Sequence, residues 1–321
     1  MPPLGLDAHA ASKVQESTLS VYRKAVLPFT TWLIEEGLTP NSSVQWDDLL
    51  VEWKNAKLIT KNQFQNTVAA VEFFFKFHDK LAWSRHVLAG WNIAHVPRHT
   101  TPMVASLACL FAIHLSCLGH PRLGIGLLLQ QCTGMRPSEM LALLGHHVLF
   151  PESCNIPTQT QVVIRLGFRT GTKAKREQCC AFDPALRPDL ANLLRRLLES
   201  TPGDERLFPY NLQQYGRVLK KISKMLQIEH LGLTPHSPRA GFASQASLEG
   251  KTFLEIREKG RWLSDSSLRV YLDVVGALSI SVDAQLINLK PQIEQAQNRL
   301  LEYFSPSHLC ATDGAQGING K

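Results

Sequence analysis

Two short segments in the C-terminal third of the chain concentrate side chains that could do chemistry. The first, HSPR, contains His236 and Arg239, and the second, GRWLSDSSLRVYLD, contains Trp262 and Tyr271. Trp262 follows Arg239 by 23 residues, and Tyr271 follows Trp262 by nine. Taken singly, each has an ordinary structural explanation, because a histidine at a helix start and a Trp–Tyr pair are common core residues. Taken together, they raise the question of whether Tyr271 is a nucleophile.

Two further segments carry charged residues that could join this group. In TGMRPSEM, Arg136 and Glu139 are three residues apart at a helix start, so the carboxylate can lie beside the guanidinium and orient it. The alternative is a surface salt bridge. In the turn RTGTKAKRE, Lys173 has Lys175 as a near competitor, and a lysine in a turn is usually just exposed to solvent.

The order and spacing of these residues resemble the signature of the tyrosine recombinases, also called the phage integrase family. That signature runs Arg with Glu or Asp three residues later, Lys in a β-hairpin, His-x-x-Arg, His or Trp, and then Tyr. The last four positions match in spacing as well as in order, and the match covers most of residues 103–275. The matching residues are Arg136, Glu139, Lys173, His236, Arg239, Trp262 and Tyr271.

The resemblance implies that Tyr271 attacks a DNA backbone phosphate and forms a 3′-phosphotyrosyl link. Free tyrosine has a pKa near ~10, so attack at neutral pH needs a base or a strongly positive site. Arg136 and Arg239 would supply that field, because guanidinium groups match pairs of phosphate oxygens. Lys173 would protonate the departing 5′ oxygen, and His236 would accept or share a proton near the nucleophile.

The remaining positions of the signature imply supporting roles. Trp262 would donate its indole N–H to a phosphate oxygen without moving a proton, and Glu139 would hold Arg136 in place. The phosphotyrosine conserves the bond energy for religation, so ATP is not expected, and the sequence G-x-x-x-x-G-K-S/T is absent. Because two arginines and a lysine would replace divalent cations, we expect no metal and no other cofactor.

The chain departs from the family pattern at two places. Arg261 stands where the family usually has glycine before the His or Trp, with Gly260 one residue earlier, and we expect it to add a phosphate contact. Arg136 and Lys173 are 37 positions apart, a long gap for the family that results from the insert GHHVLFPESCNIPTQT. Lys175 therefore remains the alternative general acid.

Hydrophobic periodicity predicts the elements that position these residues. Apolar helices are expected over 103–118 and about 122–131, with Gly134 as a breaker and Pro137 at the first turn of the next helix. Residues 161–183 read as a β-hairpin. Helices about 184–200, 211–227 and 278–304 follow. The expected fold class is mainly α with a small β-hairpin or sheet, an α+β catalytic domain preceded by a helical domain.

The N-terminal part resembles the family's helical core-binding domain in size and helical content only. Val21, Ala25, Phe29 and Trp32 share one helical face, and a second helix is expected over 61–77 with Thr60 as its N-cap. The predicted organisation is a disordered segment 1–14, a DNA-binding domain 15–95, a linker 96–102, a catalytic domain 103–304 and a disordered tail 305–321.

Charge points to a polyanionic partner. The net charge is +7 and the pI about 9.1. A basic stripe on 211–227 is either a solvated face or a surface that follows DNA phosphates. The resemblance implies that this partner is double-stranded DNA, held by two domains in a C-shaped clamp. The predicted DNA-binding residues are Arg217, Lys220, Lys221, Lys224, Arg261, Lys175 and Lys61.

Cysteine usage and the N-terminus bear on the compartment. Seven cysteines without a C-x-x-C pair favour free, mostly buried thiols over disulfides or zinc ligands. The start MPPLGLDAHAASK has no signal-peptide pattern, and the apolar run 103–119 is short for a membrane span. We expect an intracellular protein without a membrane association, nuclear in a eukaryote and cytoplasmic in a bacterium.

The resulting hypothesis is a site-specific recombinase, integrase or mobile-element transposase that acts as a homotetramer on DNA. The C-terminal helix 278–304 would pack either on a neighbouring protomer or on its own domain. Two alternatives remain open. A type IB topoisomerase-like enzyme shares the chemistry but relaxes supercoils as a monomer, and a domesticated DNA-binding protein could keep the fold without turnover.

Overall fold

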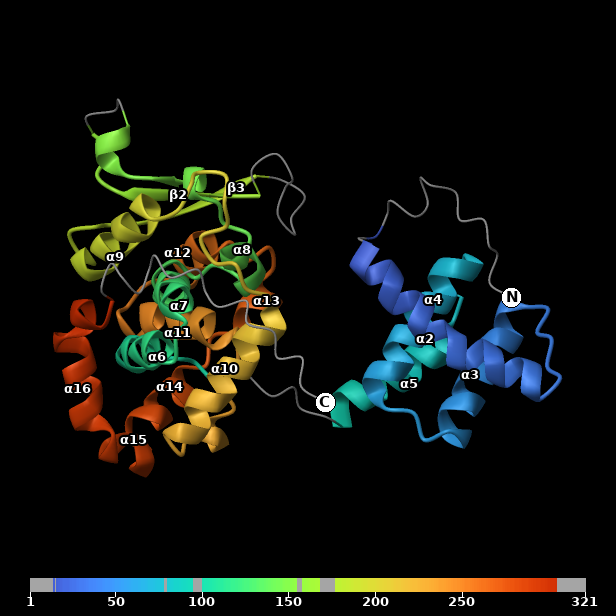
Figure 1. Ribbon diagram of the computed structural model, residues 1–321. Helices are drawn as coiled ribbons and strands as arrows, with labels where there is room; N and C mark the ends of the chain where they lie inside the picture. Colours follow the sequence, from blue (N-terminus) through green and yellow to red (C-terminus); the bar gives the residue numbers. More distant parts are fainter. Residues whose placement is uncertain are drawn as a thin grey trace. The chain divides into compact units, whose positions relative to one another are not determined.

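The computed structural model describes residue 14 and residues 16–77, 80–94, 100–154, 158–167 and 177–304 (Figure 1). The chain divides into two compact units, Met1–Arg98 and His99–Lys321, and each has its own hydrophobic core. The predicted disordered tail, the predicted disordered start apart from residue 14, and the linker residues 96–99 lie outside the described residues.

The first unit is helical, as the sequence predicts. Its described helices are α2 (Glu16–Glu35), α3 (Ser43–Ala56), α4 (Lys61–Phe75) and α5 (Ala82–Ala94). Helix α2 packs on α4, and α3 packs on α5. Phe29 is completely buried at the centre, with ring contacts to Trp32, Trp46 and Trp53. Aromatic side chains from α2 and α3 therefore supply much of this core.

Two local features of this unit test the sequence patterns. Thr60 is the N-cap of α4 and forms a capping box with Gln63, as predicted. The helix ends at Phe75 because Lys76 turns into the left-handed region, with φ of 59°. On α2, Phe29 and Trp32 face the core, but Val21 is 44% exposed, because the buried face runs instead through residues such as Leu19 and Val26.

Two long helices form the centre of the second unit. Helices α6 (Ala105–Cys117) and α7 (Pro121–Thr133) pack against each other, and both predicted apolar helices are confirmed. Pro121 begins α7 because its missing N–H would have no partner in the first turn. Gly134 ends α7 with a left-handed φ of 65°. The short helix α8 (Pro137–Leu141) follows directly.

The sheet lies at one end of this unit, opposite α14 and α15 (Figure 1). Its described strands are β1 (Val148–Leu149), β2 (Val162–Leu166) and β3 (Gln178–Phe182), paired antiparallel in that order. The 3-10 helices η1 (Gly145–His147) and η2 (Pro151–Ser153) flank β1. Val162, Ile164 and Leu166 alternate onto the buried face. The predicted hairpin is confirmed, but its turn, with Lys173 and Lys175, lies outside the described residues.

The elements after the sheet carry the C-terminal half of the signature. They are α9 (Pro188–Glu199), α10 (Leu212–Met225), η3 (Glu229–Leu231), α11 (Ser237–Leu248), α12 (Phe253–Gly260) and α13 (Asp265–Arg269). Helix α11 packs on α7 and α12. On α10, Leu219, Ile222 and the C-cap Leu226 are buried, so the predicted division into an apolar and a basic face is confirmed.

The predicted continuous helix 278–304 is wrong. The chain forms α14 (Val274–Ser281), α15 (Ala284–Asn288), α16 (Lys290–Asn298) and η4 (Leu300–Tyr303). Asp283 starts α15 by accepting hydrogen bonds from the N–H groups of Gln285 and Leu286, and Pro291 lies in the first turn of α16. Helix α16 packs on α6, and Leu300 and Phe304 are buried in the core of this unit. The apolar face thus packs on its own domain, and a tetramer stays a prediction.

The described cysteines are free, as expected, although only Cys109 and Cys180 are fully buried while Cys117 and Cys179 are exposed. No described helix combines the length and the apolar character that crossing a membrane would require.

Candidate active site

The N-terminal end of α11 places His236 and Arg239 side by side. His236 is the N-cap residue, half-buried, and Pro238 occupies the first turn. Arg239 is only 1% exposed. Its Nη1 donates to the carbonyl oxygen of Gly134, and its Nη2 donates to the carbonyl oxygen of Gly260 at 2.8 Å. Two backbone carbonyls from the ends of α7 and α12 therefore hold this guanidinium in one orientation.

Trp262 covers Arg239. The Arg239 guanidinium carbon lies 3.9 Å from the centre of the Trp262 ring, within cation–π distance. The ring lies so close to the end of α12 that a Cβ added at Gly260 would be 1.6 Å from it. The indole is also stacked with the ring of Phe242, with 6.5 Å between the ring centroids. Gly260 is therefore required for the position of the tryptophan, and with it for the covering of Arg239.

The Tyr271 hydroxyl oxygen lies 3.2 Å from Nδ1 of His236. Tyr271 follows α13, and its own carbonyl accepts a hydrogen bond from the Ser244 hydroxyl on α11. Its ring lies 5.6 Å from the Trp262 ring and 5.6 Å from the Arg239 guanidinium carbon. The four residues that the sequence spacing singles out therefore meet at one place, built from α11 and the two segments that follow α12 and α13.

Arg136 and Glu139 join the site from the start of α8. Glu139 Oε1 accepts from Arg136 Nη1 at 2.6 Å, and its Oε2 accepts from the Arg136 backbone N–H at 2.8 Å. Oε2 also accepts from Nη2 of Arg261 at 2.7 Å. Arg136 is half-buried, and its Nη2 donates to the Arg261 carbonyl oxygen at 3.5 Å. One carboxylate therefore connects two guanidinium groups.

The positive charges crowd one another. Burial, together with the charges of Arg136 and Arg261, lowers the pKa of Arg239 to about 9, so it is still protonated at neutral pH. Burial alone would raise the pKa of Glu139, but the charge of Arg261 and the hydrogen bonds and charge of Arg136 outweigh it and lower this pKa. Glu139 is therefore ionised at neutral pH, and the cluster retains excess positive charge.

The indole N–H of Trp262 is a buried donor that faces no partner in the described chain. Its Nε1 is inaccessible to solvent. Leaving a buried N–H unpaired costs about 1–3 kcal/mol. This donor is the atom for which the sequence predicts a phosphate oxygen as acceptor.

Solved structures of recombinases resemble this chain, whereas no protein-family model and no curated protein matches its sequence. A post-cleavage complex of the XerH site-specific recombinase with a palindromic difH substrate gives a TM-score of 0.54 at 13% identity, over 86% of this chain and 79% of that chain. A pre-cleavage XerH complex with difH gives 0.49 at 15% identity, covering 76% and 70%. The XerA recombinase gives 0.41 at 15%, covering 88% and 94%.

The chain has the tyrosine recombinase fold. This confirms the predicted fold class, a mainly helical chain with a small antiparallel sheet. Of the seven signature residues, the structure brings six together in one cluster. They are Arg136, Glu139, His236, Arg239, Trp262 and Tyr271. The seventh, Lys173, and its alternative Lys175 lie outside the described residues.

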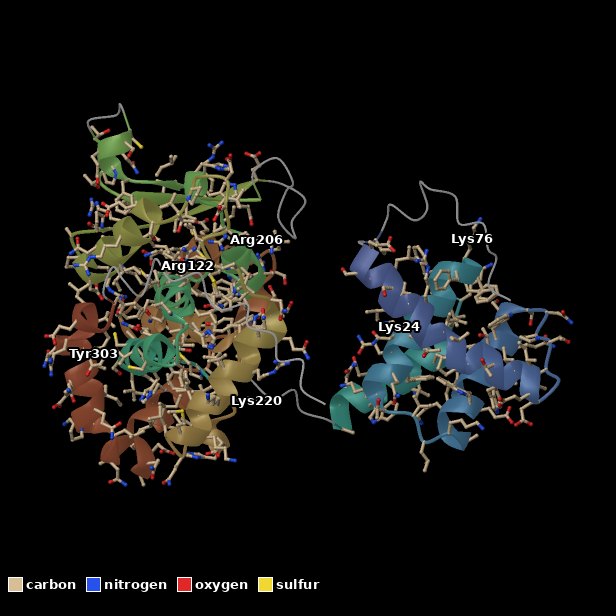
Figure 2. The ribbon with its side chains drawn as sticks, viewed as in Figure 1. Lys24, Lys76, Arg122, Arg206, Lys220 and Tyr303 are labelled. Carbon is tan, nitrogen blue, oxygen red and sulfur yellow. The ribbon has the colours of Figure 1, made fainter. Side chains whose placement is uncertain are left out.

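Five of the seven predicted DNA-binding residues lie on α10 and α4, and Lys175 lies outside the described residues. Arg217, Lys220, Lys221 and Lys224 are all exposed along α10, where Figure 2 labels Lys220. Lys61 is half-buried at the first position of α4 in the other unit. Arg261 is instead buried beside Glu139, with its side chain 6% exposed.

Sequence reasoning did not identify the groups that hold Arg239. The Gly134 and Gly260 carbonyls carry no side-chain signal, although both residues stand out as glycines at helix ends. Phe242 was also missed. Its ring occupies the place where a Cβ on Gly134 would lie, at 2.5 Å, and it stacks with Trp262. These residues form the floor of the site in this tyrosine recombinase fold.

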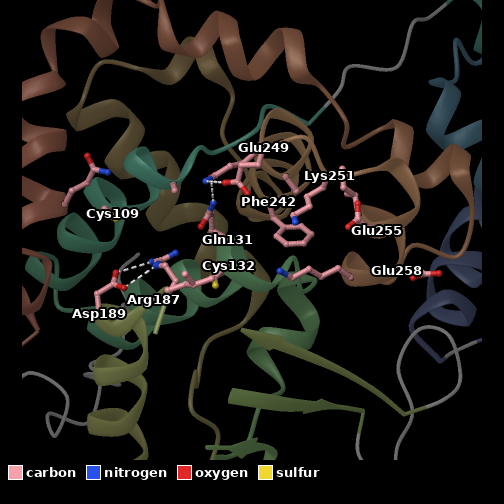
Figure 3. Close-up of a pocket in the computed structure, with 17 residues that line it drawn as sticks. Cys109, Gln131, Cys132, Arg187, Asp189, Phe242, Glu249, Lys251, Glu255 and Glu258 are labelled. Carbon is pink, nitrogen blue, oxygen red and sulfur yellow. Dashed lines mark hydrogen bonds and ion pairs between the residues drawn. The ribbon is translucent and has the colours of Figure 1, made fainter. Parts of the chain in front are cut away.

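A cavity of about 750 Å³ is lined by Phe242 together with residues outside the site (Figure 3). Phe242 lines it from the site, and the ion pair of Arg187 with Asp189 lines another wall. Gln131 donates to Gln245, which in turn donates to Glu249 at 2.9 Å.

Nowhere among the described residues do three His, Cys, Asp or Glu side chains gather where they could hold a metal ion. The expected metal independence stays a prediction.

Proposed function

We propose that this protein is a DNA strand transferase of the tyrosine recombinase class that cuts and rejoins DNA through a 3′-phosphotyrosine at Tyr271. The observation that carries the proposal is the contact of the Tyr271 hydroxyl with Nδ1 of His236, at 3.2 Å, beside the buried Arg239. A hydroxyl with a proton acceptor at hydrogen-bonding distance and a fixed cation nearby are the parts that an activated oxygen nucleophile needs.

The proposed reaction is a transesterification. The Tyr271 oxygen attacks the phosphorus, its proton passes toward unprotonated Nδ1 of His236, and the bond from phosphorus to the 5′ oxygen breaks. That oxygen takes a proton from Lys173 or Lys175, which the sequence predicts to lie in the hairpin turn. The phosphodiester bond is exchanged for a phosphotyrosyl ester of similar energy, so the reverse attack by a 5′ hydroxyl rejoins the strand without ATP.

Arg136 and Arg239 bind the phosphate in this proposal. Guanidinium groups pair with two oxygens each, and their charge stabilises the extra negative charge of the pentavalent transition state. Trp262 donates its unpaired indole N–H to a third oxygen. The crowding that lowers the pKa of Arg239 is relieved when a phosphate with a negative charge enters. The site is therefore complementary to a phosphodiester in charge and in donors.

Double-stranded DNA is the proposed partner. The net charge of +7 and the exposed basic stripe on α10 support contacts with DNA phosphates, which position the duplex without reading its sequence. The two XerH structures are complexes with a difH substrate. For this chain we propose DNA as the class of partner and not that particular substrate. We propose that both units contact the duplex, as the family resemblance implies.

A covalent adduct tests the proposal. Fragments bound by the protein are first selected from a random duplex library, and the selected site is then placed in a nicked duplex that traps the cleaved intermediate. The wild type is expected to form an adduct that survives denaturing gel electrophoresis. Tyr271→Phe should form none, whereas the control Tyr303→Phe, on η4, should behave as the wild type.

Each competing function gives a different result in the same assay. Equal adduct from the wild type and Tyr271→Phe would overturn the proposal. A domesticated DNA-binding protein would select DNA but form no adduct. A type IB topoisomerase-like enzyme would form the adduct and relax supercoiled plasmid as a monomer without joining strands from two duplexes.

A further inference from the structure

Arg261 occupies an unusual backbone position. It is the C-cap of α12, with a left-handed φ of 60° that favours glycine, yet the residue there is an arginine. The tyrosine recombinases that this sequence resembles usually have glycine at this place. From this turn the side chain runs into the protein, where it is 6% exposed. The chain therefore maintains a buried charge at a position where the backbone prefers no side chain.

The contacts of Arg261 lead to Arg136. Its Nη2 donates to Glu139 Oε2 at 2.7 Å, the same oxygen that accepts the Arg136 backbone N–H. Its own carbonyl accepts from Arg136 Nη2 at 3.5 Å. Arg261 thus contacts Arg136 twice, once through the carboxylate and once through its backbone. The start of α8 and the end of α12 are joined by this pair of contacts.

The charges show why a second arginine matters. With Arg136 alone, the Glu139 carboxylate would cancel the charge that Arg136 offers to a phosphate. Because Arg261 shares the carboxylate, the group of two arginines and one glutamate keeps a net positive charge. The charge of Arg261 is also the largest influence that lowers the Glu139 pKa against the effect of burial, so the carboxylate stays ionised and keeps holding Arg136.

We propose that Arg261 is a positioning residue for strand cleavage: it fixes Glu139 so that the Arg136 guanidinium is held, still positively charged, for the scissile phosphate. The proposal rests on the proposed function of the site. It differs from the sequence expectation of a direct phosphate contact, because the Arg261 side chain is 6% exposed and its Nη2 is engaged by Glu139. Arg261 acts through Glu139 and not on the DNA.

The first test uses the protein alone. Nitrogen-15 NMR follows the Nε–H signal of Arg136, assigned by its loss in Arg136→Lys. In the wild type this signal should be protected from solvent exchange. In Arg261→Met this signal should shift and exchange at least several-fold faster. The control Arg257→Met removes a charge on α12 that is paired with Asp265, and it should leave the Arg136 signal unchanged. An unchanged Arg136 signal in Arg261→Met overturns the proposal, whatever the activity.

The second test separates cleavage from binding on the nicked duplex that carries the selected site. Arg261→Met should lower single-turnover cleavage by roughly 100-fold while the DNA dissociation constant stays within about twofold. Arg261→Lys should recover part of the rate, because it restores the charge without the planar fork. In a Glu139→Gln background, Arg261→Met should have little further effect, since the two residues act as a unit.

The outcomes are distinct. If Arg261 contacts DNA, Arg261→Met weakens binding and lowers the slope of log affinity against log salt by about one, which overturns the positioning role. Additive losses in the double variant also overturn it. Arg261→Gly, which suits the left-handed turn, shows whether any loss arises from misfolding. If the wild type forms no adduct at all, the proposed function fails, while the NMR result still decides whether Arg261 holds Arg136.

Discussion

The two arginines of the site are held in opposite ways. Arg239 is almost completely buried and donates to two backbone carbonyls, which are neutral, so it keeps its full charge under the Trp262 ring. Arg136 is half-buried and is held by a carboxylate, which would cancel its charge if Arg261 did not share it. Burial and its charged neighbours lower the pKa of Arg239, whereas charge balance decides what Arg136 offers. Neutral backbone carbonyls thus fix a cation without cancelling its charge, whereas a carboxylate does so only when a second cation shares it.

The largest expected effect comes from removing the dipole-held arginine. Arg239→Ala should lower single-turnover cleavage by roughly 1,000-fold, because a preorganised charge next to the phosphate is lost. Binding to the same duplex, measured by fluorescence anisotropy, should fall far less, since other basic residues supply most of the affinity. Equal losses in cleavage and binding would mean that Arg239 only binds DNA, and the contrast with Arg136 would lose its meaning.

A smaller effect is expected from disturbing the carbonyl that holds Arg239. In Gly260→Ala, the new methyl group overlaps the Trp262 ring, so the indole must move off the guanidinium. We expect a loss of about 1–3 kcal/mol in the free energy of unfolding, measured by urea denaturation, and slower cleavage. Gly203→Ala is the control, because the nearest atom to the added carbon is 4.0 Å away and its backbone is not left-handed. A Gly260→Ala protein as stable as the wild type would contradict the tight fit of the indole.

Trp262→Phe isolates the unpaired indole N–H. The ring that covers Arg239 is retained but the donor is lost, so cleavage should fall roughly 10-fold, the value of one hydrogen bond of about 1.4 kcal/mol to the phosphate. The free energy of unfolding should fall only slightly or not at all, because the lost donor has no partner in the free protein. Trp262→His, which keeps a donor, should cleave faster than Trp262→Phe. The reverse ranking would exclude a phosphate contact at this position.

The smallest expected effect concerns how stability depends on pH through Glu139, the carboxylate that holds Arg136. The pKa of Glu139 is lowered by folding, so its ionised form stabilises the native state above its unfolded pKa, and this contribution is lost as the pH falls through the folded pKa. Urea denaturation across acidic pH should therefore show a steeper loss of stability in the wild type than in Glu139→Gln. Parallel curves for the two proteins would show that Glu139 is not held in this way.

The sequence predicted the residues of the site better than what holds them. His236, Arg239, Trp262 and Tyr271 could be placed together because their spacing matches a known pattern, and the β-hairpin followed from its β-branched residues. The carbonyls of Gly134 and Gly260 could not be found, since any residue has a carbonyl and only tertiary packing aims it.

Two further differences have local physical reasons. The expected helix 278–304 is interrupted because Asp283 caps a new helix and Pro291 lies in the first turn of another. In the sequence, the strong apolar periodicity outweighed these two helix-start signals. The inward course of Arg261 depends on a left-handed backbone angle, which no side-chain pattern specifies for an arginine. The presence of most helices and the residues of the site were therefore predictable, whereas helix breaks and reversals of direction at single residues were not.

The left-handed turn at Arg261 has a consequence for how this protein would respond to selection. Glycine suits that angle and would also remove a buried charge with two unpaired nitrogens, so Arg261→Gly should raise thermal stability. The same change removes the support of Arg136. A laboratory screen for heat resistance alone would thus favour glycine here and recover proteins that bind DNA but cut it poorly, so stability and activity would be in conflict at one residue.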